Sequence, residues 1–222
     1  MRWLTYLRYF LYLGVNWNFR LAFRILGEEI RGERHHQIET TGADSLRRLS
    51  KQGIDIRHST IYMPVSYSLL TKLLSALPVN GRNHLFDYGC GKGRALCVAA
   101  HAGFKKVSGV DFSPEFCSKA LQNLESTARR IHSFSYQVQQ GRAENTELPD
   151  DVDCVFLFNP FDETTLNQVL AKVKESNRRQ PRPIHLIYVN PLYRNLLARH
   201  GFVELYHTRE MVYLEGILAV SN

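Results

Sequence analysis

One carboxylate and three glycines stand close together in the segment LFDYGCGKGRA. Asp87 ends a short apolar run, and Gly89, Gly91 and Gly93 follow at alternate positions before a helix-like stretch. A tight turn from a strand into a helix needs positive φ angles and no Cβ atoms, so that the backbone can approach a ligand at the helix N-terminus. The free N–H groups there favour a carboxylate or a phosphate. The sequence therefore predicts a ligand-binding glycine loop at this turn.

The spacing of these glycines excludes two common nucleotide motifs. Counted from Gly89, the dinucleotide pattern G-x-G-x-x-G needs a third glycine at the position of Arg94. A P-loop needs a hydroxyl residue directly after its lysine, but Lys92 is followed by Gly93. The pattern that does match is D-x-G-x-G-x-G, which begins at Asp87.

With this motif, the chain from Tyr62 to its C-terminus resembles the class I S-adenosylmethionine-dependent methyltransferases. The resemblance implies that Asp87 and the glycine loop hold the methionine end of S-adenosylmethionine. It also implies that Asp111, which ends the next apolar run in KVSGVDFSPE, accepts hydrogen bonds from both ribose hydroxyls. A carboxylate suits this task because it has two acceptor oxygens and no donor to satisfy. Phe112 beside it would cover the adenine.

The adenine end of the predicted site leaves two interpretations open. The family often has an acidic residue before an alanine to bind the adenine amino group, but Arg142 precedes Ala143 here. Arginine cannot accept that hydrogen bond. Either Glu144 takes over this role, or the backbone around Ala143 holds the adenine together with stacking.

The residues Asn159-Pro160-Phe161 follow a later apolar run and resemble the N-P-P-[YFW] motif of methyltransferases that act on nitrogen, with one proline missing. The resemblance implies that Asn159 and a neighbouring carbonyl accept the hydrogens of an amine, while Phe161 packs against the target. Little more is required, because the sulfonium is already activated and positioning supplies much of the rate. The alternative is a plain turn at a strand end.

A second resemblance joins IYMPVSY, ahead of the glycine loop, to the two motifs already described. The series is similar to lysine methyltransferases of the Dot1 type and to related small bacterial proteins. It implies that Tyr62 and Pro64 line the cofactor site. The sequence departs from these enzymes at 159–161, so their substrate is not carried over.

The elements that must position these residues are short apolar runs alternating with helix-like segments. The expected strands are His84–Asp87, Lys106–Asp111, Phe134–Gln139, Asp153–Asn159 and Ile184–Asn190, and the expected helices are Gly93–Ala102, Ser113–Arg130, Asp162–Ser176 and Leu192–His200. Such alternation indicates βαβ units, and two β-rich runs near the C-terminus indicate an antiparallel hairpin. We therefore predict an α/β, doubly wound, Rossmann-like fold with a mostly parallel seven-stranded sheet.

Residues 1–80 are expected to form a helical N-terminal extension to a cofactor-binding methyltransferase domain at 81–222. Amphipathic helices are predicted at Asn16–Arg31 and Ser66–Leu77, with a short helix at Ala43–Ser50. Up to Gly27 the chain has four arginines, both tryptophans and no acidic residue. Two interpretations follow: residues 1–27 pack on the domain as a lid, or they make a peripheral contact with a membrane surface.

Composition limits the class of protein. Lys and Arg exceed Asp and Glu for a net charge of +7, which favours acidic partners without naming one. The four cysteines form no C-x-x-C pair, which indicates a reduced, cytoplasmic protein, membrane-associated if the N-terminal helix binds lipid. The histidines and cysteines show no ligand spacing, so we expect no metal.

Together these features predict an S-adenosylmethionine-dependent methyltransferase that acts on an amine nitrogen. The acceptor itself is not identified, and a protein lysine, a small molecule and a lipid-linked compound are all compatible with the sequence. Sequence-specific DNA is not expected, because no separate target-recognition domain is visible. Two alternatives stay open: a non-catalytic protein that only binds S-adenosylmethionine, and a membrane-surface or scaffold protein that acts through its N-terminal helix.

Overall fold

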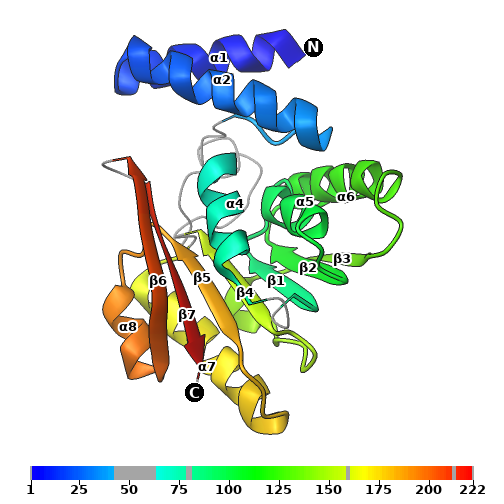
Figure 1. Ribbon diagram of the computed structural model, residues 1–222, viewed down its shortest axis with the longest axis vertical. Coiled ribbons are helices and arrows are strands. Elements are labelled where there is room, and N and C mark those ends of the chain that lie inside the picture. The colour runs from blue at the N-terminus through cyan, green and yellow to red at the C-terminus, as the bar shows by residue number, and fades with distance from the viewer. Residues whose placement is uncertain (1, 43–63, 79–81, 159–160, 212–213, 222) are drawn as a thin grey trace.

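The computed structural model describes residues 2–42, 64–78, 82–158, 161–211 and 214–221. Figure 1 shows a sheet with helices on both faces. Two further helices, α1 (Arg2–Asn16) and α2 (Phe19–His36), lie side by side across one end of this domain. The N- and C-termini lie at opposite ends of the molecule.

The sheet has seven strands in the order β3-β2-β1-β4-β5-β7-β6. Their bounds are β1 (His84–Tyr88), β2 (Lys106–Asp111), β3 (Ser135–Gln140), β4 (Cys154–Phe158), β5 (His185–Val189), β6 (Phe202–Met211) and β7 (Leu214–Ser221). The first five strands are parallel, whereas β7 pairs antiparallel with both β5 and β6. The predicted doubly wound sheet with its C-terminal hairpin is confirmed. The strand order reverses between β1 and β4, where a crevice opens at the carboxyl ends of the strands in folds of this kind.

Some of the helices of the domain begin at a residue whose side chain caps them. Their bounds are α4 (Tyr67–Ala76), α5 (Arg94–His101), α6 (Pro114–Ala128), the short 3₁₀ helix η2 (Ala143–Asn145), α7 (Glu163–Arg179) and α8 (Arg194–Arg199). Ser113 Oγ accepts a hydrogen bond from Phe116 N at 3.3 Å, and Pro114 occupies the first helical position. Asp162 caps α7 in the same way through Thr165 N. Serine and aspartate are preferred at this position because their side-chain oxygens satisfy free N–H groups.

Two apolar layers enclose the sheet. One contains residues of α4, α5 and α6, and the other contains residues of α7 and α8. Helix α4 is part of the first layer, and its Leu69 and Leu73 are fully buried. A Cβ atom on Gly216 of β7 would lie only 2.5 Å from Leu73 Cδ1, so the glycine permits this close contact. Helix α4 therefore packs directly on the sheet, while the boundary at residue 80 stays a prediction.

The N-terminal region contains two helices where the sequence predicted one at Asn16–Arg31. Helix α1 ends at Asn16. Asn18 then caps α2, because its side-chain oxygen accepts a hydrogen bond from Leu21 N at 2.8 Å. The turn is tight because Gly14 carries no Cβ, which would lie 2.4 Å from the Phe19 ring. The helical period was predicted correctly, but the capping role of Asn18 was missed. The short helix predicted at Ala43–Ser50 lies outside the described residues.

Among the described residues, none of the helices is both long enough and apolar enough to cross a bilayer.

Candidate functional site

The glycine loop joins β1 to α5 at the carboxyl end of β1. Gly89, Gly91 and Gly93 have φ angles of +85°, +52° and +80°, so the predicted positive φ angles are confirmed. Gly93 is also sterically restricted, because a Cβ there would lie 3.0 Å from the Ala120 Cβ of α6. Any side chain at this position would both strain the backbone and push the loop away from α6.

The loop is held against β2. Gly89 N and Cys90 N both donate to Val110 O, at 2.8 and 3.0 Å. This approach depends on Gly109 of β2, where a Cβ would lie 2.7 Å from Cys90 Cβ and 3.0 Å from Asp87 O. The motifs recognised in the sequence assign Gly109 no role. The available signal was a glycine inside an apolar strand, which often marks a place where another backbone comes close.

Asp111 connects the loop to the start of α6. Its Oδ2 accepts a hydrogen bond from Gly91 N and its Oδ1 accepts one from Ser113 N, both at 2.9 Å. The side chain is only 6% exposed. Burial raises the pKa of Asp111 to about 6, although the two N–H donors favour the charged form. Asp111 therefore fixes the shape of the predicted site at the carboxyl end of β2.

Asp87 lies on the adjacent strand and is even less exposed, at 3%. Burial raises the pKa of this carboxyl well above its usual range, and the negative charge of Asp111 adds to the effect. A buried carboxyl whose pKa is raised further by a neighbouring carboxyl favours a ligand with positive charge or with hydrogen-bond donors. This property distinguishes the site from one built for a phosphate.

The predicted adenine end lies next to Asp111. Gly141 N donates to Asp111 O at 2.9 Å, which brings the residues after β3 to the end of β2. Ala143 is buried in η2, and Phe112 is half-buried. Glu144 Oε1 lies 2.5 Å from Arg142 Nε, so the carboxylate is paired with the arginine before it. The two interpretations of adenine binding both stay predictions.

The predicted acceptor motif follows β4, which pairs with β1 so that Phe156 lies opposite Asp87. Asn159 and Pro160 lie outside the described residues, as does Tyr62. Phe161 is described, is half-buried and packs against the apolar layer of α7 and α8.

A buried ion pair connects α2 to the first turn after the glycine loop. Arg94 Nη1 and Nη2 donate to the two carboxylate oxygens of Glu29 at 2.7 and 2.5 Å. Arg94 Nε donates to Thr40 Oγ1 at 2.8 Å, and its guanidinium lies 4.1 Å from the centre of the Tyr67 ring. Arg94 and Glu29 are 3% exposed. The sequence motifs assign Arg94 no role beyond excluding a dinucleotide motif, although a charged residue at the start of the apolar run RALCVAA needs a buried partner.

The chain after α2 passes close to the glycine loop. Glu33 Oε1 accepts hydrogen bonds from Thr40 N and Thr41 N, at 2.5 and 2.6 Å, and shapes this segment. Asn123 of α6 then joins it to the loop, because its Nδ2 donates to Lys92 O at 2.9 Å and its Oδ1 accepts from Glu39 N at 2.9 Å. The helical extension therefore contacts the domain at the carboxyl end of β1, beside the predicted site.

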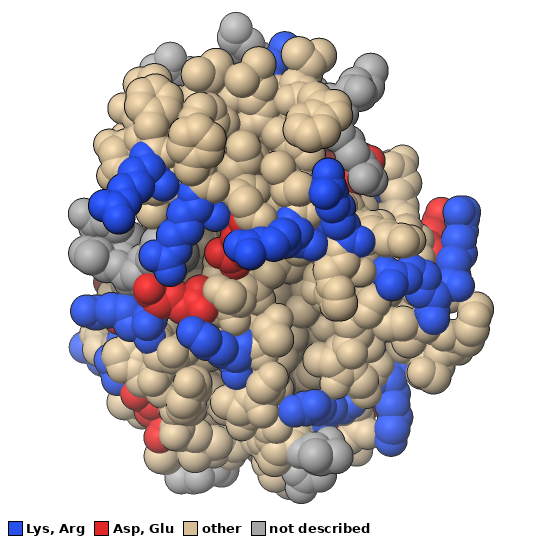
Figure 2. Space-filling model, turned by 45° about the horizontal axis from the view of Figure 1, so that its top comes forward, with Lys and Arg blue, Asp and Glu red and all other residues tan. Residues whose placement is uncertain are grey.

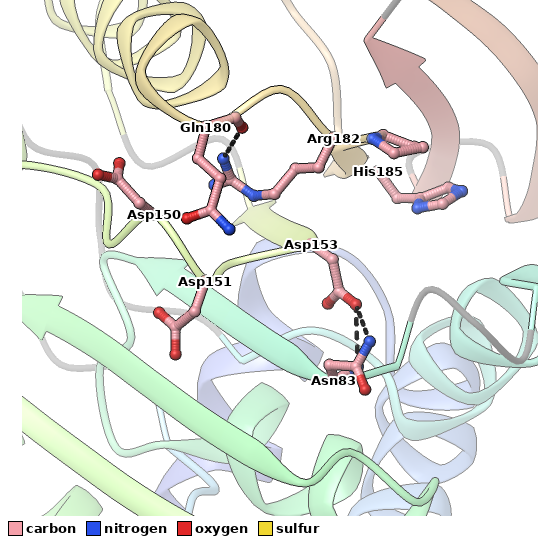
Figure 3. A pocket seen from close by; sticks show the side chains of 8 residues that line it. Asn83, Asp150, Asp151, Asp153, Gln180, Arg182 and His185 are labelled. Atoms are coloured by element: carbon pink, nitrogen blue, oxygen red, sulfur yellow. Dashed lines mark hydrogen bonds between the residues drawn. The ribbon is translucent and has the colours of Figure 1, made fainter.

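A pocket on another part of the molecule does not belong to this site. Its lining residues are Asn83, Asp150, Asp151, Asp153, Gln180, Arg182, Pro183 and His185. Most of them precede or begin strands β1, β4 and β5, so the pocket lies at the amino ends of the strands. Asp153 accepts hydrogen bonds from both nitrogens of Asn83, and Arg182 donates to Gln180 O and to four other acceptors, as Figure 3 shows in part. These contacts join neighbouring turns, which is a structural role.

Within the described ranges, no three His, Cys, Asp or Glu side chains are grouped so that they could hold a metal ion. All four cysteines are free and buried.

Comparisons with known proteins show what the chain is similar to. Residues 85–179 match the family model described as a methyltransferase domain. The PH0226 protein of Pyrococcus horikoshii is 18% identical, with a TM-score of 0.51 over 70% of this chain and 89% of that one. An S-adenosylmethionine-dependent methyltransferase of Mesorhizobium loti is 14% identical, with a TM-score of 0.52 over 68% and 96% of the two chains. StiE O-MT is 11% identical, with a TM-score of 0.51 over 69% and 72%. A search of curated proteins finds no match.

The solved structures share the fold, and the family match covers the glycine loop and both carboxylates. Residues 85–179 therefore match a methyltransferase domain, and the chain has the fold of these solved methyltransferases. The match supports a transferase that uses S-adenosylmethionine as its cofactor.

Proposed function

We propose that this enzyme transfers the methyl group of S-adenosylmethionine to an amine nitrogen, in a protein lysine or a small molecule. The observation that carries the proposal is the place where strand β4 ends in the sheet. Strand β4 lies beside β1, with Phe156 opposite Asp87, so β4 ends at Phe158 on the edge of the sheet where the glycine loop begins. The next residues in the sequence, Asn159, Pro160 and Phe161, have the groups to accept amine hydrogens and to pack against the acceptor.

The same geometry supports an assignment of residues to the cofactor. The ammonium and sulfonium groups of S-adenosylmethionine are positive, and they suit the buried carboxyl of Asp87 and the glycine loop beside it. The ribose offers two hydroxyl donors, and each oxygen of Asp111 keeps a lone pair beyond the one that accepts a backbone N–H. Phe112, Ala143 and Glu144 remain the candidates for the adenine. Tyr62 remains a candidate from the sequence alone.

The bound cofactor supplies a sulfonium methyl that needs no further activation. The protein must therefore orient an acceptor in line with that methyl, exclude water and remove a proton if the amine arrives charged. The extension that contacts the carboxyl end of β1 is placed to help exclude water, because Glu29 and Asn123 fix it beside the glycine loop.

The replacement of Asn159 by alanine tests the assignment. Asn159→Ala should lower the rate of methyl transfer to amines by about a hundredfold, the scale of losing a positioning group, while the affinity for S-adenosylhomocysteine stays unchanged. The rate would be measured with labelled S-adenosylmethionine against a panel of amines, and the affinity by calorimetry. Asn167→Ala, on the exposed face of α7, is the matched control and should change neither quantity.

Equal losses of rate and affinity in Asn159→Ala would mean that this residue only supports the fold. StiE O-MT shares the fold, so the acceptor panel should include hydroxyl compounds. If only the hydroxyl compounds are labelled, the acceptor atom is oxygen and the assignment to nitrogen is wrong.

A further inference from the structure

An apolar face covers the outer side of the α1–α2 pair. It consists of Trp3, Leu4, Leu7, Leu11, Val15, Trp17, Phe19 and Phe23, which are all large, apolar and exposed. Val15, Trp3 and Phe23 expose 79%, 72% and 68% of their surface. Soluble surfaces rarely gather so many large apolar side chains on adjoining turns, and such a patch marks an interaction site.

The contact between α1–α2 and the domain does not use this face. Helix α1 turns a second apolar side inward, where Tyr9 and Leu13 pack with Ala22 of α2. Helix α2 reaches the domain through Glu29 in its second half, which pairs with Arg94. The two interpretations of the N-terminal region are therefore compatible, because the lid contact and the apolar face involve different sides of the helices.

The charge around the apolar face is positive. Arg8, Arg20 and Arg24 are exposed, and residues 2–27 include no Asp or Glu. Arg20 and Arg24 directly follow Phe19 and Phe23 on α2, so the arginines border the apolar side chains. Figure 2 shows this end of the molecule with a broad area of uncharged side chains and with Lys and Arg side chains below it. An apolar surface bordered by arginines matches a bilayer surface, where acyl chains lie beneath phosphate groups.

The dimensions and composition of the helices fit a bilayer surface. Helix α1 has 15 residues, which corresponds to a length of about 22 Å, whereas the hydrocarbon core of a bilayer is about 30 Å thick. Its inner side is already packed against α2, so only the outer side is available to lipid. Both tryptophans of the chain, Trp3 and Trp17, are on the apolar face. Tryptophan is enriched at the level of lipid headgroups because its ring is apolar and its N–H is polar.

We propose that the apolar face binds the surface of a bilayer that contains anionic lipids, with α1 and α2 lying in the plane of the interface. The inference does not depend on the identity of the acceptor atom. The bound bilayer would lie on the same side of the domain as the glycine loop, because α2 is joined to Arg94 beside that loop.

Vesicle sedimentation of the full chain tests the proposal. The protein should sediment with vesicles of phosphatidylcholine and phosphatidylglycerol, and much less with vesicles of phosphatidylcholine alone. The variant Leu7→Glu/Leu11→Glu should lose binding to both kinds of vesicle. The variant Arg20→Gln/Arg24→Gln should lower the affinity for anionic vesicles at least about tenfold and abolish the preference for them.

Two matched variants control for folding and for general charge effects. Leu121→Glu/Leu192→Glu replaces exposed leucines elsewhere, and Arg178→Gln/Arg199→Gln replaces exposed arginines elsewhere. Both should sediment like the parent protein, and all variants should keep its affinity for S-adenosylhomocysteine.

Failure of the parent protein to bind anionic vesicles would overturn the proposal. So would a parent dimer that Leu7→Glu/Leu11→Glu converts to a monomer in light scattering without any vesicle binding. The apolar face would then be a contact between two copies of the chain. Equal loss of vesicle binding in the control variants would also contradict the membrane proposal, since the binding would then not depend on this face.

Discussion

At the scale of single residues, the two buried carboxyl groups shape the predicted cofactor site. Asp87 and Asp111 lie on adjacent strands, and burial raises the pKa of both. Both are almost completely buried, so water can do little to stabilise their negative charge. A ligand that brings positive charge and hydroxyl donors would provide that stabilisation, so the protonation of these groups and the binding of the cofactor should be coupled.

The affinity for S-adenosylmethionine should therefore depend on pH. The pKa of Asp111 is raised to about 6 in the unliganded protein, and the cofactor favours the charged carboxylate. Binding below this pH must release a proton, so the affinity should fall by up to about tenfold for each pH unit below 6 and level off above it. Calorimetric titrations between about pH 5 and about pH 8 would measure this slope. An affinity that rises toward low pH would contradict the role of the carboxylates.

Replacement of Asp111 tests its role directly. Asp111→Ala should weaken binding of S-adenosylhomocysteine by about 1 to 3 kcal/mol, because hydrogen bonds to a charged group are lost. The variant also removes the acceptor for Gly91 N and Ser113 N, so its free energy of unfolding should be measured beside the affinity. Asp150→Ala, at the amino ends of the strands, is the control and should bind the ligand normally. Unchanged affinity in Asp111→Ala would exclude Asp111 from the site.

At the scale of elements, the site depends on how closely β1, β2 and α6 approach one another. The loop after β1 crosses β2 at Gly109 and contacts α6 at Gly93, and neither contact leaves room for a Cβ atom. Gly89 N and Cys90 N bond to β2 rather than to their own helix. Small residues at two crossings therefore determine the shape of the loop, in addition to the glycines of the motif itself.

A pair of glycine substitutions separates this steric effect from a general effect of alanine. Gly109→Ala should reduce the free energy of unfolding by about 1 to 3 kcal/mol, because its Cβ would overlap Cys90 in a packed interior. Gly27→Ala has open space in α2 and should be neutral or stabilising by up to about 1 kcal/mol. Urea denaturation of both variants would measure the difference. Equal changes in the free energy of unfolding would show that the loop does not pack closely against β2 at Gly109.

At the scale of the whole molecule, the helical extension and the methyltransferase domain share a buried charged contact. Arg94 and Glu29 lie 65 positions apart in the chain and are joined by two hydrogen bonds. Thr41 Oγ1 and Val65 O complete the surroundings of the pair. The contact fixes the extension beside the glycine loop and, with it, the apolar face on the outer side of α1 and α2.

Breaking this contact should destabilise the protein strongly. Glu29→Ala leaves the Arg94 guanidinium buried without its carboxylate, and the free energy of unfolding should fall by about 3 to 5 kcal/mol. The double variant Glu29→Ala/Arg94→Ala should lose less than the sum of the two single variants, since neither charge is then left unpaired. Arg34→Ala, an exposed residue of the same helix, should have little effect. Additive losses in the double variant would mean that the two side chains do not act as a pair.

The sequence by itself determined the alternation of strands and helices, the glycine loop, and the placing of Asp87 and Asp111 at the ends of β1 and β2. These features depend on neighbouring residues, because hydrophobic period, capping and positive φ are local properties of the chain. Only the tertiary structure decided the partner of Arg94, the need for Gly109, and the division of the N-terminal helices into a side facing the domain and an apolar face. Each of these depends on contacts between distant residues, and no local spacing specifies which surfaces will meet once the chain has folded.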